Sequence, residues 1–129
     1  MAKKILIVED DAVISTMYAT KLRMSGFEVT EVENGADAVM YLDGNVPDAI
    51  LMDMMMPVMN GFDAISMIRS YIPGAKAAKI IVFSNLDGDE HQKRAFKLGA
   101  DGYMVKAETT PAKVVAFLGE LLGDGETLG

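Results

Sequence analysis

The stretch Asp48-Ala49-Ile50-Leu51-Met52-Asp53 is a short apolar run that ends in a carboxylate. Three further runs also end in polar residues: Lys4–Val8 in Glu9-Asp10-Asp11, Ile80–Phe83 in Ser84, and Tyr103–Val105 in Lys106. Runs without polar alternation indicate strands buried on both faces, as in parallel sheets. Because the carboxyl ends of parallel strands share one edge, where ligands bind at a topological switch point, we expect these polar residues to converge on Asp53.

Outward from this stretch, strand-like runs alternate with longer segments of helical periodicity. This pattern indicates βαβ units and a parallel sheet. The predicted strands are Lys4–Val8, Glu28–Val32, Ala49–Met52, Lys79–Phe83 and Gly102–Val105. The predicted helices are Ala12–Ser25, Ala36–Leu42, Phe62–Ile72, Asp89–Leu98 and a last one beginning at Pro111. Only Glu28–Val32 alternates polar and apolar residues, so we expect it at a sheet edge.

The first predicted helix has clear end signals. Asp11 or Asp10 can cap its start, and Gly26 supplies a stop after it. Its expected apolar face consists of Ile14, Met17, Tyr18 and Leu22. Thr110 can cap the last helix in the same way.

Composition predicts one acidic domain. The chain has 129 residues with a formal charge of −7, which disfavours direct binding to nucleic acid or to an anionic membrane. It has no cysteine, which excludes disulfides, thiolate catalysis and cysteine-ligated zinc. No run approaches the roughly 18 apolar residues of a membrane span, and no signal peptide is evident, so a cytoplasmic protein is expected. We expect one domain over residues 1–122 and a frayed tail over 123–129.

The three consecutive acids Glu9, Asp10 and Asp11 cannot all point into one site, so we expect two ligating acids and one surface or capping acid. Together with Asp53 they would raise one another's carboxyl pKa values unless a cation neutralises them. Mg²⁺ prefers oxygen ligands and bridges to phosphate. This set of residues therefore suits phosphoryl transfer to Asp53.

Each residue also has a purely structural interpretation. Acids after a first strand are often helix caps, Asp53 could be a loop acid, Ser84 could start a turn, and a single lysine such as Lys106 is usually solvated. The conjunction of four strand-end signals favours a functional site. His91 is the only histidine and is expected on a helix surface.

These residues resemble the motifs of response-regulator receiver domains, the CheY-like module of two-component signalling. The motifs are Ile7–Asp11, Leu51–Pro57, Asn60-Gly61, Val82–Asn85 and Gly99–Lys106. The resemblance covers about the first 120 residues. It implies an α/β, flavodoxin-like doubly wound (βα)5 three-layer sandwich, with a parallel five-stranded sheet in the order 2-1-3-4-5.

The resemblance also implies a magnesium-dependent phosphoacceptor. Asp53 matches the residue that takes phosphate from the phosphohistidine of a histidine kinase or phosphotransfer protein. Asp10 and Asp53 match the direct Mg²⁺ ligands, Met55 the ligand through its backbone carbonyl, and Glu9 the acid that acts mainly through bound water. Such a chain catalyses only its own phosphorylation and dephosphorylation and is not a turnover enzyme.

A switch is implied as well. Ser84 matches the hydroxyl that moves to the phosphoryl oxygen. Lys106 matches the family's lysine, which forms an ion pair with the phosphoryl group. Tyr103 matches the aromatic residue whose inward or outward position follows the hydroxyl. The surface expected to change is formed by the fourth helix, fifth strand and fifth helix, which would alter affinity for an unknown downstream protein.

The sequence departs from the family pattern at two positions. Ala107 follows Lys106 where the family usually has proline, often after a cis peptide. Since a cis bond before a non-proline residue costs about 2.5–4 kcal/mol, either this bond is trans and the loop is rebuilt, or the site supports strain. Asn85 follows Ser84 in place of a small residue, and its amide either narrows access to the phosphoryl pocket or selects a different kinase.

Met55 and Leu86 match the neighbours of the hydrolytic water. Apolar side chains there cannot orient a nucleophilic water, so slow hydrolysis of the aspartyl phosphate is the hypothesis.

Other functions are open. A phosphatase or phosphotransferase could use Asp53 as nucleophile, although Met55 stands where such enzymes carry a second aspartate. A constitutive interaction module would not need the acids, Ser84 and Lys106. A flavin-binding protein would need a Ser/Thr/Gly-rich loop after the first strand, which is absent from the sequence.

Overall fold

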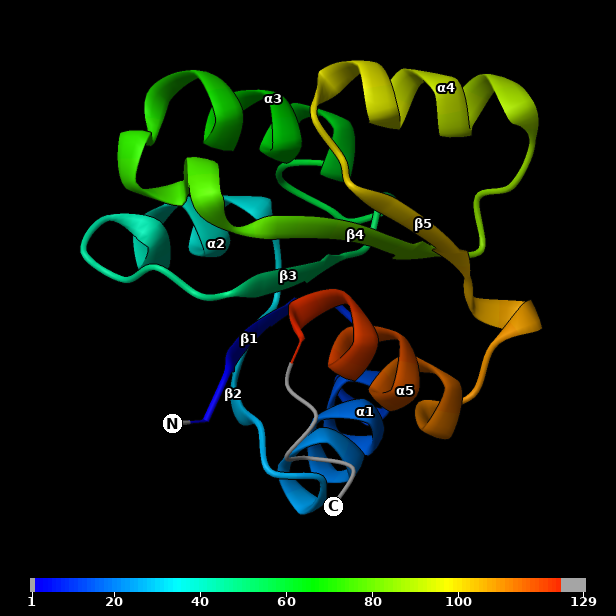
Figure 1. Ribbon diagram of the computed structural model, residues 1–129. Helices are drawn as coiled ribbons and strands as arrows, with labels where there is room; N and C mark the ends of the chain where they lie inside the picture. Colours follow the sequence, from blue (N-terminus) through cyan, green and yellow to red (C-terminus); the bar gives the residue numbers. More distant parts are fainter. Residues whose placement is uncertain (1, 124–129) are drawn as a thin grey trace.

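The computed structural model describes residues 2–123. The strands are β1 (Lys4–Val8), β2 (Glu28–Val32), β3 (Ala49–Met52), β4 (Lys79–Ser84) and β5 (Gly102–Val105). The α-helices are α1 (Ala12–Met24), α2 (Gly35–Leu42), α3 (Gly61–Tyr71), α4 (Asp89–Leu98) and α5 (Pro111–Leu122), and short 3₁₀ helices are η1 (Pro73–Ala77) and η2 (Lys106–Glu108). Strands and helices alternate along the chain, as predicted (Figure 1).

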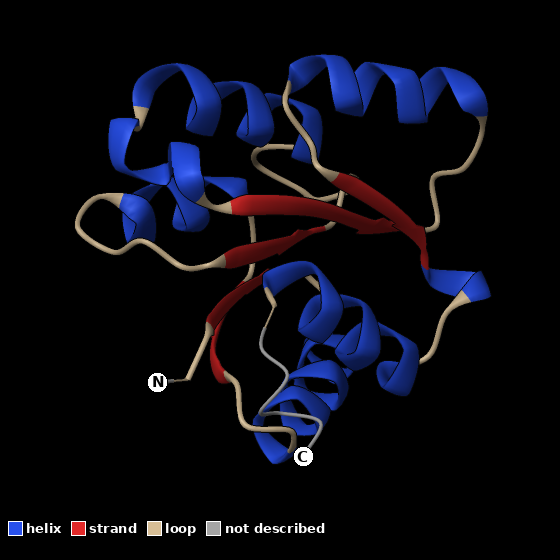
Figure 2. Ribbon diagram, viewed as in Figure 1, coloured by secondary structure: helices blue, strands red, loops and turns tan. Residues whose placement is uncertain are grey.

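The sheet is parallel, with strand order β2-β1-β3-β4-β5. Helices α1 and α5 cover one face, and α2, α3 and α4 cover the other, which makes three layers (Figure 2). The predicted flavodoxin-like α/β fold and strand order are confirmed. The amphipathic strand β2 lies at one edge, as expected, and β5 lies at the other.

Helix boundaries follow the caps. The Asp11 carboxylate accepts hydrogen bonds from the backbone N–H of Val13 and Ile14 at 3.0 and 3.1 Å, so of the two candidate caps Asp11 is the one used. Asn34 and Asn60 cap α2 and α3, which therefore begin one residue earlier than predicted. Thr110 caps α5 as expected.

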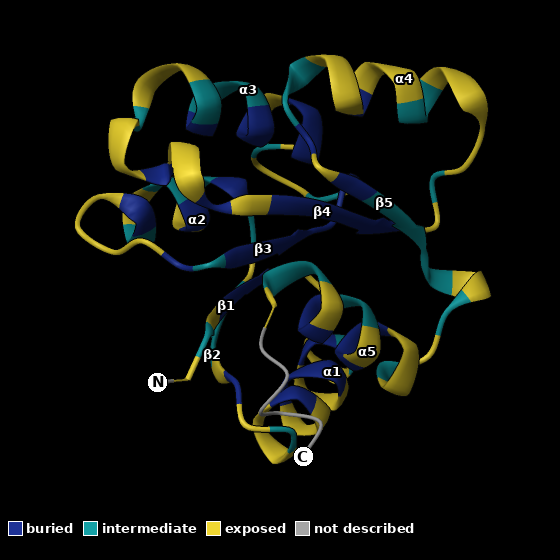
Figure 3. Cartoon of the chain, in the orientation of Figure 1, coloured by how far each residue is buried: buried dark blue, intermediate teal, exposed yellow. Residues whose placement is uncertain are grey.

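The core is divided by the sheet into two apolar layers. One layer contains Leu6, Ile50 and Val82 with residues of α2, α3 and α4, and the other contains Ile5, Leu51 and Phe83 with residues of α1 and α5. The strands are accordingly buried on both faces at the centre of the sheet (Figure 3). Met17 was predicted on the buried face of α1, but its side chain is 49% exposed. The prediction was wrong because the buried face of α1 is formed by Ser15, Tyr18, Ala19 and Leu22, and Met17 lies beside this face rather than on it.

One arginine ties three segments together on the α3 side. The Arg69 guanidinium donates to the carbonyls of Ala75 and Gly99 at 3.1 and 3.0 Å and pairs with Asp101 at 2.8 Å. Asp101 also accepts from the backbone N–H of Ile80 at 2.9 Å. The end of α3, η1 and the turn between α4 and β5 are thereby held to β4.

Within residues 2–123, no helix combines the length and apolarity that a membrane crossing requires. The predicted tail, apart from Gly123, lies outside the described residues.

Candidate functional site

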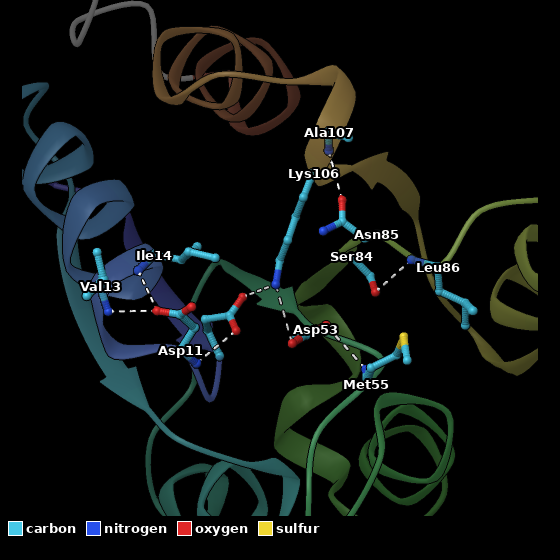
Figure 4. A network of polar contacts seen from close by, with 11 residues as sticks. Asp11, Val13, Ile14, Asp53, Met55, Ser84, Asn85, Leu86, Lys106 and Ala107 are labelled. Carbon is cyan, nitrogen blue, oxygen red and sulfur yellow. Dashed lines mark hydrogen bonds and ion pairs between the residues drawn. The ribbon is translucent and has the colours of Figure 1, made fainter.

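The carboxyl edge of the sheet brings the predicted polar residues together. Glu9 follows β1, Asp53 follows β3, Ser84 ends β4 and Lys106 follows β5. Neighbouring strands end in register here, with Val8 of β1 opposite Met52 of β3 and Ser84 of β4 opposite Val105 of β5. Figure 4 shows the Asp53 and Lys106 side chains pointing toward each other from opposite sides of the site.

Three carboxylates form a compact cluster. Glu9, Asp10 and Asp53 each offer an oxygen, and these atoms all lie within 4.8 Å of one another. Glu9 and Asp53 are buried, whereas Asp10 is exposed. Because Asp11 caps α1, the expected division of the consecutive acids into two cluster members and one cap is what the structure shows. Clustered hard oxygen donors of this kind fit a Mg²⁺ ion.

The ammonium of Lys106 enters this cluster. Its Nζ forms an ion pair with Glu9 Oε1 and lies 3.4 Å from Asp53 Oδ2. Only 13% of the Lys106 side chain is exposed. Burial by itself would lower the pKa of Lys106, but the hydrogen bond with Glu9 and the charges of Asp53 and Glu9 outweigh it, so the pKa is raised above its ordinary value.

Glu9 is the most perturbed acid of the cluster. Burial raises its pKa from 4.5 to about 7, against the lowering effect of hydrogen bonds from Lys106 and from the Asp11 N–H, while the charge of Asp53 raises it further. The site thus holds more negative charge than Lys106 balances at neutral pH. A divalent cation would relieve this excess.

Ser84 and Tyr103, the predicted switch pair, meet at Leu86. The backbone N–H of Leu86 donates to Ser84 Oγ at 3.2 Å. The Tyr103 hydroxyl donates to the carbonyl of Leu86. Sequence reasoning did not foresee this link, because both bonds end on backbone atoms of Leu86. The tyrosine is therefore connected to the serine through one residue of the loop between β4 and α4.

Met55 lies directly against the phosphoacceptor candidate. Its backbone N–H donates to Asp53 Oδ1 at 3.2 Å, while its side chain is 63% exposed. Gly61 packs on the same loop, and a Cβ there would lie 2.5 Å from the carbonyl oxygen of Asp53. Asp53 is therefore held at its side chain by the Met55 N–H and at its backbone by the close packing of Gly61.

The peptide between Lys106 and Ala107 is trans, as are all peptide bonds of residues 2–123. The rebuilt loop is the 3₁₀ helix η2. Asn85, which is exposed, accepts a hydrogen bond from the Ala107 N–H through its Oδ1 at 2.9 Å. The two positions that depart from the family pattern are thus in contact. The sequence shows a polar amide, Asn85, directly after a strand. It does not show that the partner of this amide is the backbone N–H of Ala107.

Comparison with known proteins agrees with this geometry. The sequence profile described as "Response regulator receiver domain" matches residues 5–117. The chain is 38% identical to a chemotaxis protein CheY of Thermotoga maritima over 122 residues, covering 94% of this chain and 98% of the relative. It is 35% identical to a chemotaxis protein CheY of Halobacterium salinarum, covering 87% and 91% of the two chains.

A solved structure gives the same result for the fold. The chemotaxis protein CheY4 of Vibrio cholerae superposes with a TM-score of 0.86 at 27% identity, covering 93% of this chain and 98% of that one.

Proposed function

Because this chain belongs to the response regulator receiver domain family, we propose that it is a phosphoacceptor switch in which Asp53 takes a phosphoryl group from a phosphohistidine. Receiver domains of this family serve two-component signalling, interact with histidine kinases and downstream effectors, and generally bind Mg²⁺ at an acidic site. The observation that carries the proposal is the placement of the Lys106 ammonium between Glu9 and Asp53 in the acidic cluster.

In the proposed transfer, a carboxylate oxygen of Asp53 attacks the phosphorus of the donor. A P–O bond forms, the P–N bond breaks, and its electron pair stays on the imidazole nitrogen, which takes a proton from solvent. Lys106 compensates charge on the equatorial phosphoryl oxygens, and Ser84 donates a hydrogen bond to one of them. The Ser84 oxygen now accepts from the Leu86 N–H, and we propose that the hydroxyl moves away from this contact when its O–H turns to the phosphoryl oxygen.

We assign Mg²⁺ binding to Glu9, Asp10, Asp53 and the backbone carbonyl of Met55. Bound there, the ion supplies charge compensation to the attacking carboxylate and the phosphoryl oxygens. Asp10, which is exposed, is the member of the cluster that meets an ion arriving from solvent. Glu9 is shared between this role and its ion pair with Lys106.

The output is proposed to be a change in the surface formed by α4, β5 and α5. The Ser84–Leu86–Tyr103 link supports this proposal, because it joins the phosphoacceptor site to β5 and to the loop that precedes α4. A new bond from Ser84 to the phosphoryl group would shift the balance between two packings of this loop. Affinity for a downstream protein would then differ between the two states.

We propose that the chain performs no other turnover. It promotes its own phosphorylation and loses the group by hydrolysis. Where an aspartate-nucleophile phosphatase would place its second aspartate, this chain has Met55, whose side chain has no proton to exchange.

The test is intact-mass measurement after incubation with Mg²⁺ and either acetyl phosphate or phosphoramidate. Phosphoramidate has the P–N bond of a phosphohistidine. Wild type should gain one phosphoryl group from both donors, and Asp53→Ala should gain none. Asp63→Ala, which removes an exposed acid at the start of α3, is the matched control and should behave as wild type. No mass gain in wild type would reject the proposal and favour a constitutive interaction module.

A further inference from the structure

The Asn85 side chain links the ends of β4 and β5 beside the phosphoacceptor site. The β4–β5 ladder ends with Ser84 opposite Val105. The next residue on each strand is Asn85 and Lys106, and here the backbone pairing stops. The bond from the Ala107 N–H to Asn85 Oδ1, at 2.9 Å, connects the two chains beyond the last ladder pair.

The donor of this bond belongs to the first turn of η2. The N–H groups of a first helical turn have no acceptor within the helix, and η2 has no side-chain cap from the residue before it. Asn85 supplies the acceptor for Ala107. A proline at position 107 would have no N–H to donate, so the bond requires a residue other than proline there and the Asn85 amide as its acceptor.

The residue held between these two bonds is Lys106. It stands between Val105, the last residue paired to β4, and Ala107, the residue bonded to Asn85. A lysine stem has four rotatable carbons, so the direction of its ammonium depends on how firmly its backbone is held. Figure 4 shows the stem running from this loop down to the acids, with Asn85 alongside it.

We propose that Asn85 is a positioning residue that acts through Lys106. By fixing η2, it holds the Lys106 ammonium where a phosphoryl group on Asp53 would place its oxygens. This inference rests on the proposed function and adds to it a residue outside the acidic cluster. Its loss should weaken binding of a phosphoryl group while leaving Mg²⁺ binding unchanged, because Glu9, Asp10 and Asp53 stay in place.

The test compares Asn85→Ala with wild type in two titrations. The first measures Mg²⁺ affinity by calorimetry. The second measures affinity for beryllofluoride, a mimic of the phosphoryl group, at saturating Mg²⁺. We expect Asn85→Ala to keep the Mg²⁺ affinity and to bind beryllofluoride roughly three- to ten-fold more weakly, the effect of one hydrogen bond of ordinary net strength. Asn45→Ala is the matched control, because Asn45 is also exposed and donates to a backbone carbonyl, that of Tyr41, at 2.8 Å.

The donor side provides a second test. Ala107→Pro removes the N–H and leaves Asn85 intact. As a single substitution in the wild-type background, it should therefore weaken beryllofluoride binding. In the Asn85→Ala background it should add no further loss, because the bond is already gone. Losses that multiply in the double variant would show that the two residues act independently and would overturn the proposal.

The remaining outcomes are also decisive. Equal beryllofluoride affinity in Asn85→Ala and wild type rejects the positioning role. A parallel fall in Mg²⁺ and beryllofluoride affinity shows general damage to the site and rejects it as well. If wild type binds Mg²⁺ but no beryllofluoride and accepts no phosphate, it is the proposed function that fails, and the positioning role falls with it.

Discussion

Lys106 Nζ lies 3.4 Å from Asp53 Oδ2, although the two residues follow different strands that are not neighbours in the sheet. Strand β4 separates β3 from β5, so the lysine side chain has to reach past the end of β4 to the aspartate. With Glu9 at the end of β1, the site is assembled from the ends of four adjacent strands. Its electrostatics follow from this arrangement and from the burial of Glu9.

Stability in the absence of divalent cations should fall as pH rises from about 4.5 to about 7. The folded state raises the pKa of Glu9 from 4.5 to about 7, so over this range it binds a proton that the unfolded state has released. The whole shift corresponds to about 3 kcal/mol, at about 1.4 kcal/mol per pKa unit, and about 2 kcal/mol of it is lost between pH 5 and 7.5. Urea unfolding in EDTA at pH 5 and pH 7.5 measures it. Glu9→Gln should lack this loss, and identical pH dependence in both proteins would contradict the assignment.

Alanine variants of the adjacent acids Asp10 and Asp11 should differ in which property they lose, Mg²⁺ affinity or stability. Asp11→Ala removes the cap of α1 and should lower the free energy of unfolding by about 1 kcal/mol, with Mg²⁺ affinity retained. Asp10→Ala removes an exposed cluster acid and should weaken Mg²⁺ binding without lowering stability. Urea unfolding and calorimetric Mg²⁺ titration measure the two effects. A loss of Mg²⁺ affinity in Asp11→Ala alone would reverse the assignment.

Gly61→Ala should destabilise the protein and disturb Asp53. The added Cβ would lie 2.5 Å from the Asp53 carbonyl oxygen and 2.7 Å from Met54 Cα, and backbone atoms cannot move away cheaply. We expect a loss of about 1–3 kcal/mol with slower phosphorylation by acetyl phosphate. Gly74→Ala is the control, because its Cβ would meet only Val46 Cγ2 at 3.4 Å. Thermal unfolding distinguishes the two, and equal midpoints would contradict the close packing at Gly61.

Ser84→Ala should separate phosphorylation from switching. The variant keeps Asp53 and Lys106, so it should still accept phosphate, more slowly. Without the hydroxyl, the contact with the Leu86 N–H is lost in both states, and the Tyr103 ring resonances should no longer shift when beryllofluoride is added. Ser84→Thr retains a hydroxyl and should retain the shift. Equal Tyr103 shifts in Ser84→Ala and wild type would show that the tyrosine responds by another route.

The phosphoprotein should lose its phosphate slowly, because Met55 and Leu86 offer no group to orient a water. Met55→Asn places an amide at an exposed position beside Asp53 and should speed phosphate release several-fold. Met40→Asn, at an exposed methionine of α2, should not. Release is followed by intact mass after removal of the donor. Wild-type turnover within seconds would reject the hypothesis.

The fold was predictable because its signals are local. Apolar runs such as Ile80–Phe83 define strands. The N-caps Asn34 and Asn60 start α2 and α3 one residue before the predicted positions, so these boundaries differ by a single residue. The strand order came from the family resemblance. Burial was less predictable, as Met17 shows, since the apolar character of a methionine does not specify which side of a helix has space to fill.

The candidate site was predictable in its members but not in its connections. Strand ends identified Glu9, Asp53 and Lys106, because a parallel sheet places such ends on one edge. The hydrogen bonds of Leu86 and Ala107 were not foreseen, since they use backbone groups that every residue has. Outside the site, the contacts of Arg69 were not predicted either, because two of its acceptors are the backbone carbonyls of Ala75 and Gly99.

The position of β5 at the rim of the sheet has a mechanical consequence. A central strand such as β3 would have to give up hydrogen bonds to two neighbours before it could slide or tilt, whereas β5 is bonded to β4 alone. Small displacements therefore cost less at β5, which α4 and α5 flank from opposite sides, than at the central strands β1, β3 and β4. The acids of the site thus follow β1 and β3, which are held on both sides and keep the spacing that a metal ion needs. The surface proposed to contact a second protein contains β5, which can shift at lower cost.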